Sequence, residues 1–348
     1  SMSKFSAAFN RLWSASIASN FADGILGIAA PLVAVSLTTA PVTISMMSAL
    51  GMLPWLLFAI PIGGLADRVN RKKFLATAHI VRAFTASAVS FLIASHHLTI
   101  QLLFLAVLIF GTCEVIADTT AQTLIPQMLE KEELERGNSR LYLAETVIQN
   151  FIGNPSGGFL YGIALGLPML VSGTGYLIAA VLIMAIPLHA IHTHKTDEEK
   201  AAREPFLEEV KFGIKWLFAH KQIRHLVLMT TSIGFWFNFG NATIILFLLK
   251  TLHLKEQYFG LVWSISGIGS VIASLTAAKV SQRIGRGTVM WISMFVQCGI
   301  WIVQGTLHSY IPFVFLGIFN ALLGTYWNIL IMSTYQELIP NHLYGRIH

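Results

Sequence analysis

Six long stretches of this chain contain no Asp, Glu, Lys or Arg, and they limit its fold more than any other feature. They cover 24–66, 83–113, 146–194, 225–249, 257–278 and 287–336. A helix needs roughly 20 apolar residues to cross a hydrocarbon core about 30 Å thick, so each stretch can supply at least one span. These stretches lack the alternation of apolar and polar residues that a membrane β-barrel requires. We therefore expect an all-α integral membrane protein.

Turn-prone segments divide the three longest stretches, at Thr38–Pro41, Gly166–Pro168 and His308–Pro312. With these breaks the sequence predicts ten spans, at about 12–37, 42–66, 74–95, 99–124, 140–164, 167–191, 223–249, 257–280, 288–307 and 311–335.

The Lys and Arg residues are distributed unevenly over the expected loops. If the N-terminus is cytoplasmic, the outer loops hold only Lys250 and Lys255, and nearly all other cations lie on the inner side. This asymmetry follows the positive-inside rule and predicts a cytoplasmic N-terminus. It also explains the net charge of +6 without a nucleic-acid partner.

Two landmarks occur twice along the chain. The basic loop Gly63–Lys73 is echoed by Ser281–Arg286, and Gln122–Pro126 is echoed by Gln336–Pro340. The offset is roughly 215 residues in both cases, which indicates two copies of one helical unit.

The duplication predicts a division into an N-terminal six-helix bundle, 1–191, and a C-terminal bundle, 223–348. Residues 192–222 form the linker between them, expected in the cytoplasm. Within it, Phe206–Phe218 repeats apolar residues at helical spacing and predicts an amphipathic helix along the membrane surface. The offset further predicts that the second copy lacks its last two helices of twelve spans, a natural ten-span protein being the alternative.

Ionisable residues inside spans are costly and therefore mark functional sites. Asp23 is interpreted either as a helix-end group or as a cavity residue that binds a cation or a proton. Glu114 and Asp118 lie four residues apart on one helical face, where they could exchange a proton, although Asp118 could also pair with Arg71. Arg82 must meet an acid or line an aqueous cavity, with Asp23, Glu114 and Asp118 as possible partners.

The C-terminal spans carry neutral polar and aromatic residues instead of charges. We expect the substrate cavity to include Asn238, Asn241, Asn320, Trp327 and Asn328. The N-terminal bundle would then handle protons, while the C-terminal bundle binds substrate. The histidines show no metal-ligand spacing on one helix face, and no cofactor or metal site is expected.

The basic loop resembles the signature of the major facilitator superfamily, Gly-x-x-x-Asp-Arg/Lys-x-Gly-Arg-Arg/Lys. Asn70 replaces the usual glycine, and we expect it to preserve a tight turn because Asn also tolerates positive φ. The resemblance implies two pseudo-symmetric bundles and a conformational gating loop that stabilises the outward-facing state. The gating residues would be Gly63, Asp67, Arg68, Arg71 and Lys72, with Arg283 and Arg286 in the second copy.

Three further segments resemble the branch of macrolide efflux pumps and the enterobactin exporter. They are Asn20–Ile25, Leu124–Pro126 with the acidic stretch after it, and Gly153–Gly158. Gly153–Gly158 is similar to an antiporter motif with its spacing shifted by one, but its small residues could equally serve close helix packing.

The resemblance implies proton-coupled export of amphipathic small molecules, of drug or siderophore type. A proton-coupled uptake symporter for a nutrient or metabolite is the alternative. No catalytic constellation is found, so we do not expect an enzyme. The expected partners are a small-molecule substrate, protons and lipid, for a monomer in the bacterial inner membrane.

Overall fold

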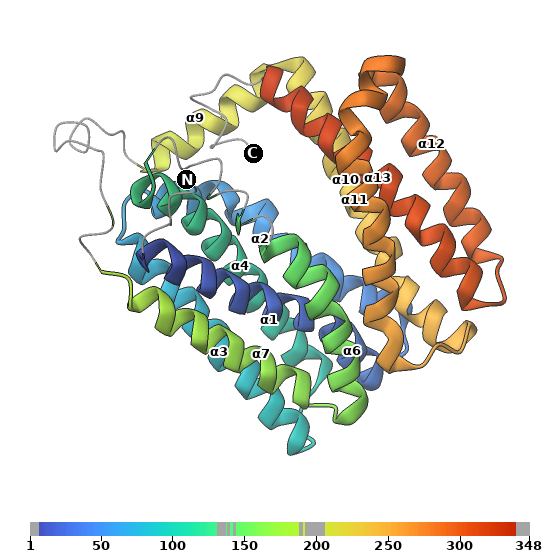
Figure 1. The fold of residues 1–348 in the computed structure, drawn as a ribbon, viewed down its shortest axis with the longest axis horizontal. Helices are drawn as coiled ribbons and strands as arrows, with labels where there is room; N and C mark the ends of the chain where they lie inside the picture. Colours follow the sequence, from blue (N-terminus) through green and yellow to red (C-terminus); the bar gives the residue numbers. More distant parts are fainter. Residues whose placement is uncertain are drawn as a thin grey trace, which may run out of the picture.

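The computed structural model describes residues 7–130, 137, 140–141, 144–187, 191 and 206–338, and every regular element in them is a helix (Figure 1). The N-terminal bundle consists of α1 (Ala7–Leu37), α2 (Pro41–Ala66), α3 (Arg71–Ala94), α4 (Ile100–Met128), η2 (Ala144–Gly153), α6 (Asn154–Ile163) and α7 (Leu167–Met184). After α9 (Phe206–Ala219), the C-terminal bundle consists of α10 (Lys221–Leu246), η4 (Phe247–Thr251), η5 (Glu256–Tyr258), α11 (Phe259–Ile284), α12 (Arg286–Gly305) and α13 (Tyr310–Leu338).

The predicted all-α membrane fold is confirmed. Within the described ranges, nine helices are long and apolar enough to cross a membrane. The expected fifth span, 140–164, differs from a regular helix because η2 is a π-helix that continues directly into α6. All three predicted breaks separate helices, and Pro41 and Pro168 lie in the first turns of α2 and α7, where a missing N–H is tolerated.

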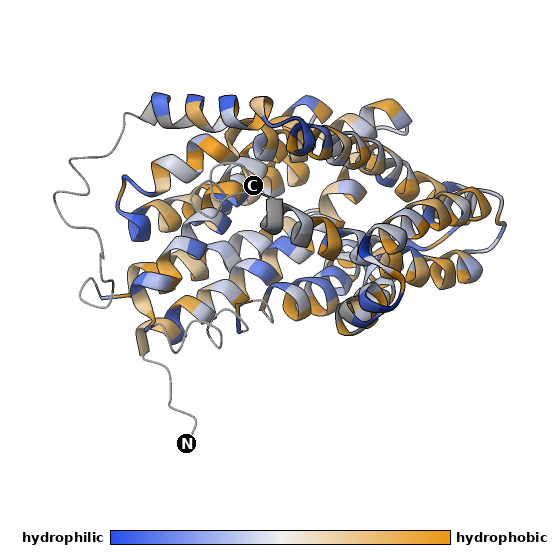
Figure 2. Ribbon diagram, turned by 90° about the horizontal axis from the view of Figure 1, so that it is seen from above, coloured by the Kyte–Doolittle hydropathy of each residue, from blue (hydrophilic) through white to orange (hydrophobic). Residues whose placement is uncertain are grey.

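Large apolar side chains cover much of the outer surface of the molecule. Phe84 is 77% exposed and Leu275 is 76% exposed, levels that would be unfavourable in water for so many residues. Figure 2 shows hydrophobic residues distributed along the whole length of the helices. This surface suits lipid rather than water.

The two bundles repeat the same helix pairings. In the N-terminal bundle α4 packs against α2 and α3, and in the C-terminal bundle α13 packs against α11 and α12. The helices that correspond at the sequence offset therefore make corresponding contacts. The predicted amphipathic helix is present as α9, which contacts both α2 and α10. The linker residues 192–205 and the repeat landmark at Pro340 lie outside the described residues.

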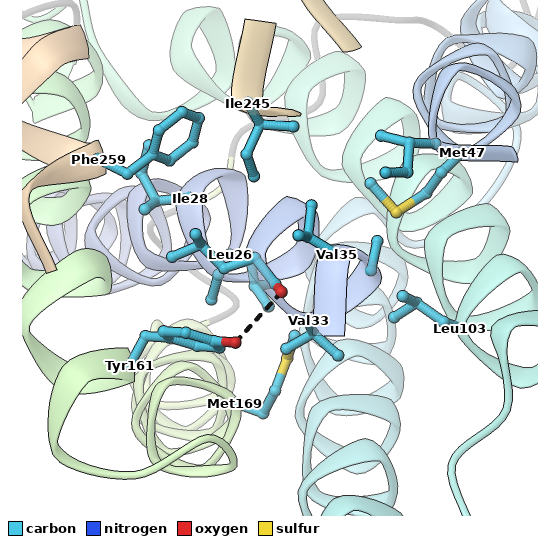
Figure 3. Close-up of a cluster of buried hydrophobic side chains, with 14 of the residues drawn as sticks. Leu26, Ile28, Val33, Val35, Met47, Leu103, Tyr161, Met169, Ile245 and Phe259 are labelled. Atoms are coloured by element: carbon cyan, nitrogen blue, oxygen red, sulfur yellow. Dashed lines mark hydrogen bonds between the residues drawn. The ribbon is translucent and has the colours of Figure 1, made fainter. Parts of the chain in front are cut away.

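One apolar core joins the two bundles at the end of the molecule that contains η5. Ile245 and Phe259 of the C-terminal bundle pack there with Ile28 and Met47 of the N-terminal bundle (Figure 3). In the same core, the Tyr161 hydroxyl donates a hydrogen bond to the Leu32 carbonyl at 3.3 Å. Toward α9 the bundles have separate cores, one made only of residues 8–191 and another around Ile223, Trp327 and Ile331. Among the described residues, the bundles therefore share a core at the η5 end and have separate cores at the α9 end.

Small residues bring the backbones of the two bundles into contact at the η5 end, where α6 lies beside α11. A Cβ on Gly260 would lie 1.9 Å from the Asn154 carbonyl oxygen, and one on Gly158 would lie 2.7 Å from that of Gln257. The opposite side of this segment faces α1, since a Cβ on Gly153 would lie 3.0 Å from the Gly24 Cα. The close helix packing proposed for Gly153–Gly158 is present, and its antiporter role stays a prediction.

Gly260→Ala should destabilise this contact, because the added methyl must displace the α6 backbone. Overpacking of this kind costs about 1–3 kcal/mol. Unfolding of the purified protein in detergent measures the loss. Gly299→Ala is the matched control, because a Cβ on Gly299 meets no atom within 4 Å. Equal stability of the two variants would contradict the close contact.

Candidate functional site

The interior of the N-terminal bundle contains an ion pair between Arg82 of α3 and Asp23 of α1. The Arg82 Nη1 atom donates to Asp23 Oδ1 at 2.8 Å, and the Arg82 side chain is only 2% exposed. Of the three acids that sequence reasoning allowed, Asp23 is thus the direct partner of Arg82. An arginine buried this deeply needs such a partner, because an unpaired charge there would be strongly destabilising.

Two residues that sequence reasoning missed complete this ion-pair cluster. The Tyr176 hydroxyl of α7 donates to Asp23, and the Arg82 guanidinium carbon lies 4.5 Å from the centre of the Tyr176 ring. His79 lies 3.1 Å from Arg82 through its Nδ1 atom and stacks on Tyr176. His79 lies one helical turn before Arg82, and this spacing could have indicated that the two side chains are neighbours. Nothing in the sequence singled out Tyr176. The cluster ties together α1, α3 and α7.

Glu114 and Asp118 lie on α4, close enough to Arg82 to interact with its charge. Neither carboxylate makes a hydrogen bond to another residue in the described part of the chain. One guanidinium neutralises one carboxylate, so the three acids exceed the single base. The bundle therefore has acidic groups left that a proton or a cation can neutralise. Arg71 pairs with Asp67 at 3.0 Å, not with Asp118.

A central cavity of about 310 Å³ lies between the two bundles. Three of the predicted substrate residues line it: Asn241 on α10 and both Asn320 and Asn328 on α13. Trp327 and Asn328 line a second cavity of about 590 Å³ among α10, α12 and α13. Asn238 lies on α10, but its side chain is outside the part of the chain that the structure describes.

Sequence reasoning left out several residues that line the central cavity. Asn150 and Asn154 contribute from the N-terminal bundle, and Gln297, Trp301 and Gln304 contribute from α12. The three α12 residues are spaced by four and three positions, which places them on one helical face. That spacing was available in the sequence. The contribution of η2 and α6 could not be found there, because it depends on how the bundles meet.

The basic loop makes its described contacts within the N-terminal bundle. Lys72 Nζ donates to the Ile186 carbonyl at 2.6 Å, and Arg11 donates to the Ala185 carbonyl at 2.8 Å. These cations satisfy carbonyl groups just after the C-terminus of α7, where positive charge is favourable. Gly63 lies on α2, and Asp67 and Arg68 follow its last residue. The gating role of these residues stays a prediction.

The expectation that Asn70 would adopt a positive φ was wrong. Asn70 has φ −67° and is the N-cap of α3, where its side chain accepts a hydrogen bond from the Lys73 amide at 3.2 Å. In the second copy, Gly285 has φ +100° and joins α11 directly to α12. Arg283 lies in the last turn of α11, and Arg286 is the first residue of α12. The two loops therefore turn by different means: an asparagine cap and a glycine.

Among the described residues, no group of three or more His, Cys, Asp or Glu side chains is arranged to hold a metal ion.

Asp23→Asn should destabilise the protein by about 3–5 kcal/mol, because it leaves the Arg82 charge buried without a carboxylate. Replacing both partners, with Asp23→Leu and Arg82→Met, should recover most of that loss. The free energy of unfolding in detergent micelles tests both, with Glu256→Gln on exposed η5 as the control. If the double variant is no more stable than Asp23→Asn, the pairing is not what stabilises this cluster.

Comparison with known proteins agrees with the fold and the membrane character described above. The model of the Major Facilitator Superfamily matches residues 12–348. No curated protein matches the chain in sequence. Among solved structures, the chain is similar to the nucleoside transporter NupG, with a TM-score of 0.74 and 15% identity over 98% of this chain and 85% of that chain.

It is also similar to a bacterial homolog of the human lysosomal transporter Spinster in an inward-facing, unoccupied conformation. The TM-score there is 0.72, with 13% identity over 97% of this chain and 76% of that chain. A bacterial homologue of the iron transporter ferroportin, in an inward-facing state, gives 0.65 with 17% identity over 97% of this chain and 86% of that chain. Identities this low establish a shared fold and nothing about substrate. Since the family model covers nearly the whole chain, this membrane protein belongs to the major facilitator superfamily and is a transporter rather than an enzyme.

Proposed function

We propose that the chain is a proton-coupled exporter of amphipathic small molecules. The observation that carries this proposal is the separation of charge between the two bundles. Asp23, Arg82, Glu114 and Asp118 lie together in the N-terminal bundle, whereas the central cavity is lined by neutral polar and aromatic side chains. Protons and substrate would thus bind at different places in one molecule. The resemblance to the macrolide-efflux and enterobactin-exporter branch supports export.

The two bundles, 1–191 and 223–348, would rock about the central cavity in alternating access. The common apolar core closes the η5 end, and the bundles have separate cores at the α9 end. With the N-terminus in the cytoplasm, as the positive charges predict, this conformation is inward-facing. Closing the α9 end requires the contacts at Gly158 and Gly260 to separate.

Coupling would occur through Glu114 and Asp118, which are acidic and have no hydrogen bond to a described residue. A carboxylate held in a salt bridge is neutralised already, as Asp23 is by Arg82. The α4 pair is therefore better placed to accept a proton from one side and release it to the other. Asp23 and Arg82 would hold α1 against α3 while this exchange takes place.

Glu114→Gln should lower substrate-dependent proton flux at least ten-fold, because an amide cannot exchange the proton. The purified full chain is reconstituted in liposomes with an imposed pH gradient and an internal pH-sensitive dye. Ethidium, erythromycin, a catecholate siderophore and neutral dansylamide serve as test substrates. Glu256→Gln is the control, since Glu256 is exposed on η5, and should retain flux. Absence of flux with every substrate, or full flux in Glu114→Gln, would count against proton coupling.

The direction of transport separates an exporter from an uptake symporter. In inverted membrane vesicles acidified inside by respiration, an exporter accumulates its substrate in the lumen. An uptake symporter instead accumulates it in right-side-out vesicles, which are alkaline inside. We expect accumulation in the inverted vesicles that is abolished by a protonophore. Accumulation confined to the right-side-out vesicles would replace export with uptake.

A further inference from the structure

We infer that the central cavity binds an uncharged part of its substrate, through amide groups that accept hydrogen bonds and beside a fixed tryptophan ring. This inference rests on the proposed transport function and specifies the class of substrate. It concerns three amides, Gln297, Gln304 and Asn320, which we call the amide relay, and the ring of Trp301.

The lining of the central cavity contains no Asp, Glu, Lys, Arg or His among the residues that the structure describes. A charged group placed there would lose its hydration without gaining a counter-ion, and an unpaired buried charge costs several kcal/mol. A neighbouring cavity of about 600 Å³ is bounded by α10, η4 and α12, and the charged side chain of Lys250 lines it. An anionic substrate could reach that cation, so anions are included in the test below.

The orientation of the amide relay is determined by a backbone carbonyl. The Phe313 carbonyl oxygen can only accept, so it fixes the Gln304 Nε2 atom, which donates to it at 2.9 Å. Gln304 must then present Oε1 to Asn320, whose Nδ2 donates to it at 2.9 Å. Gln297 Nε2 donates to the backbone carbonyl oxygen of Asn320 at 3.1 Å. Each amide nitrogen thereby donates one of its two N–H groups to an acceptor within the protein.

This arrangement leaves oxygen atoms at the unused ends of the relay. The Asn320 Oδ1 atom is buried and accepts no hydrogen bond in the described structure. An unsatisfied buried acceptor costs about 1–3 kcal/mol, which a donor group on a ligand can recover. Gln304 is only 6% exposed and Gln297 only 8%, so neither is freely hydrated. A ligand hydroxyl or N–H group that reaches Asn320 Oδ1 therefore gains a hydrogen bond that a ligand carbonyl cannot make.

Trp301 provides a rigid apolar wall beside the relay. A Cβ on Gly240 would lie 2.3 Å from the Trp301 ring, so this glycine leaves the space in which the ring packs against α10. The Phe237 ring lies 5.5 Å from it, centre to centre. A ring held in this way offers a flat surface against which an aromatic or polycyclic ligand can pack.

The ion-pair cluster does not provide a binding site for a cationic substrate either. The Asp23 carboxylate is already neutralised by Arg82 and also accepts from Tyr176, so it attracts a second cation only weakly. In the proposed function Glu114 and Asp118 bind protons. The substrate class that fits these observations is an uncharged, ring-containing molecule with a hydroxyl or amide N–H donor.

A matched set of fluorescent probes tests the charge preference. Dansylamide is neutral and carries an N–H donor, dansyl-ethylenediamine is a cation and dansylglycine is an anion. Energy transfer from tryptophan to dansyl reports their binding to the full chain in detergent, with no pH gradient. We expect dansylamide to bind at least ten-fold more tightly than either charged probe. This ranking is measured on the wild-type chain and needs no variant.

Two substitutions then assign the site to the relay. Asn320→Leu should weaken dansylamide binding at least five-fold, and Asn320→Asp should invert the ranking so that the cation binds best. Gln101→Leu on the exposed start of α4 is the control and should change neither. Elution as a single monodisperse species confirms that each variant is folded.

A wild-type chain that binds dansylamide no better than the charged probes, including one that binds none of them, overturns the inference. So does an Asn320→Asp variant with an unchanged ranking. Because the assay uses no proton gradient, its outcome is separate from that of the flux experiment. Proton flux without the expected ranking removes only the substrate class, whereas the ranking without flux removes proton coupling.

Discussion

A hydrocarbon interior offers no water to which a buried polar group can hydrogen-bond, and the arrangement of the buried polar side chains follows from that constraint. The N–H and C=O groups of the backbone form hydrogen bonds with one another in helices. Arg82 lies against Asp23 and Tyr176. Their charge and aromatic ring take the place of the water that would otherwise solvate the guanidinium. The amides of α12 and α13 donate to each other and to carbonyl groups. The polar atoms left without a partner, such as Asn320 Oδ1, are then the places at which a ligand gains most.

The two bundles meet this constraint differently, and the proposed function depends on that difference. The N-terminal bundle contains Asp23, Arg82, Glu114 and Asp118, and we propose that the last two exchange protons. The C-terminal bundle offers neutral hydrogen bonds and ring surfaces, which can hold a substrate without a counter-ion. The bundles meet in a shared apolar core and at close backbone contacts beside Gly158 and Gly260. A change in one bundle can thereby bias the position of the other.

Features set by local sequence were predictable. The breaks at Pro41 and Pro168 follow from proline chemistry in the first turn of a helix, and α9 follows from its apolar spacing. The cost of a buried cation required that Arg82 find an acid, but Asp23, Glu114 and Asp118 satisfied that requirement equally well in the sequence. Asn70 was assigned the turn geometry of the glycine that it replaces, whereas it caps α3 with its side chain. An asparagine can either adopt a positive φ or cap a helix, so its residue type alone did not decide between these roles.

The sequence by itself determined that this chain crosses a membrane many times, that it contains a duplicated unit, and that a few charged groups must be sheltered from lipid. These conclusions depend on residue composition and spacing, which fix the hydrophobic free energy of each segment. Only the tertiary structure decided which acid Arg82 meets, that Tyr176 and His79 join it, and that Asn150 and Asn154 line the central cavity. Those contacts join helices distant in sequence, and their geometry depends on how whole helices pack, which no local pattern records.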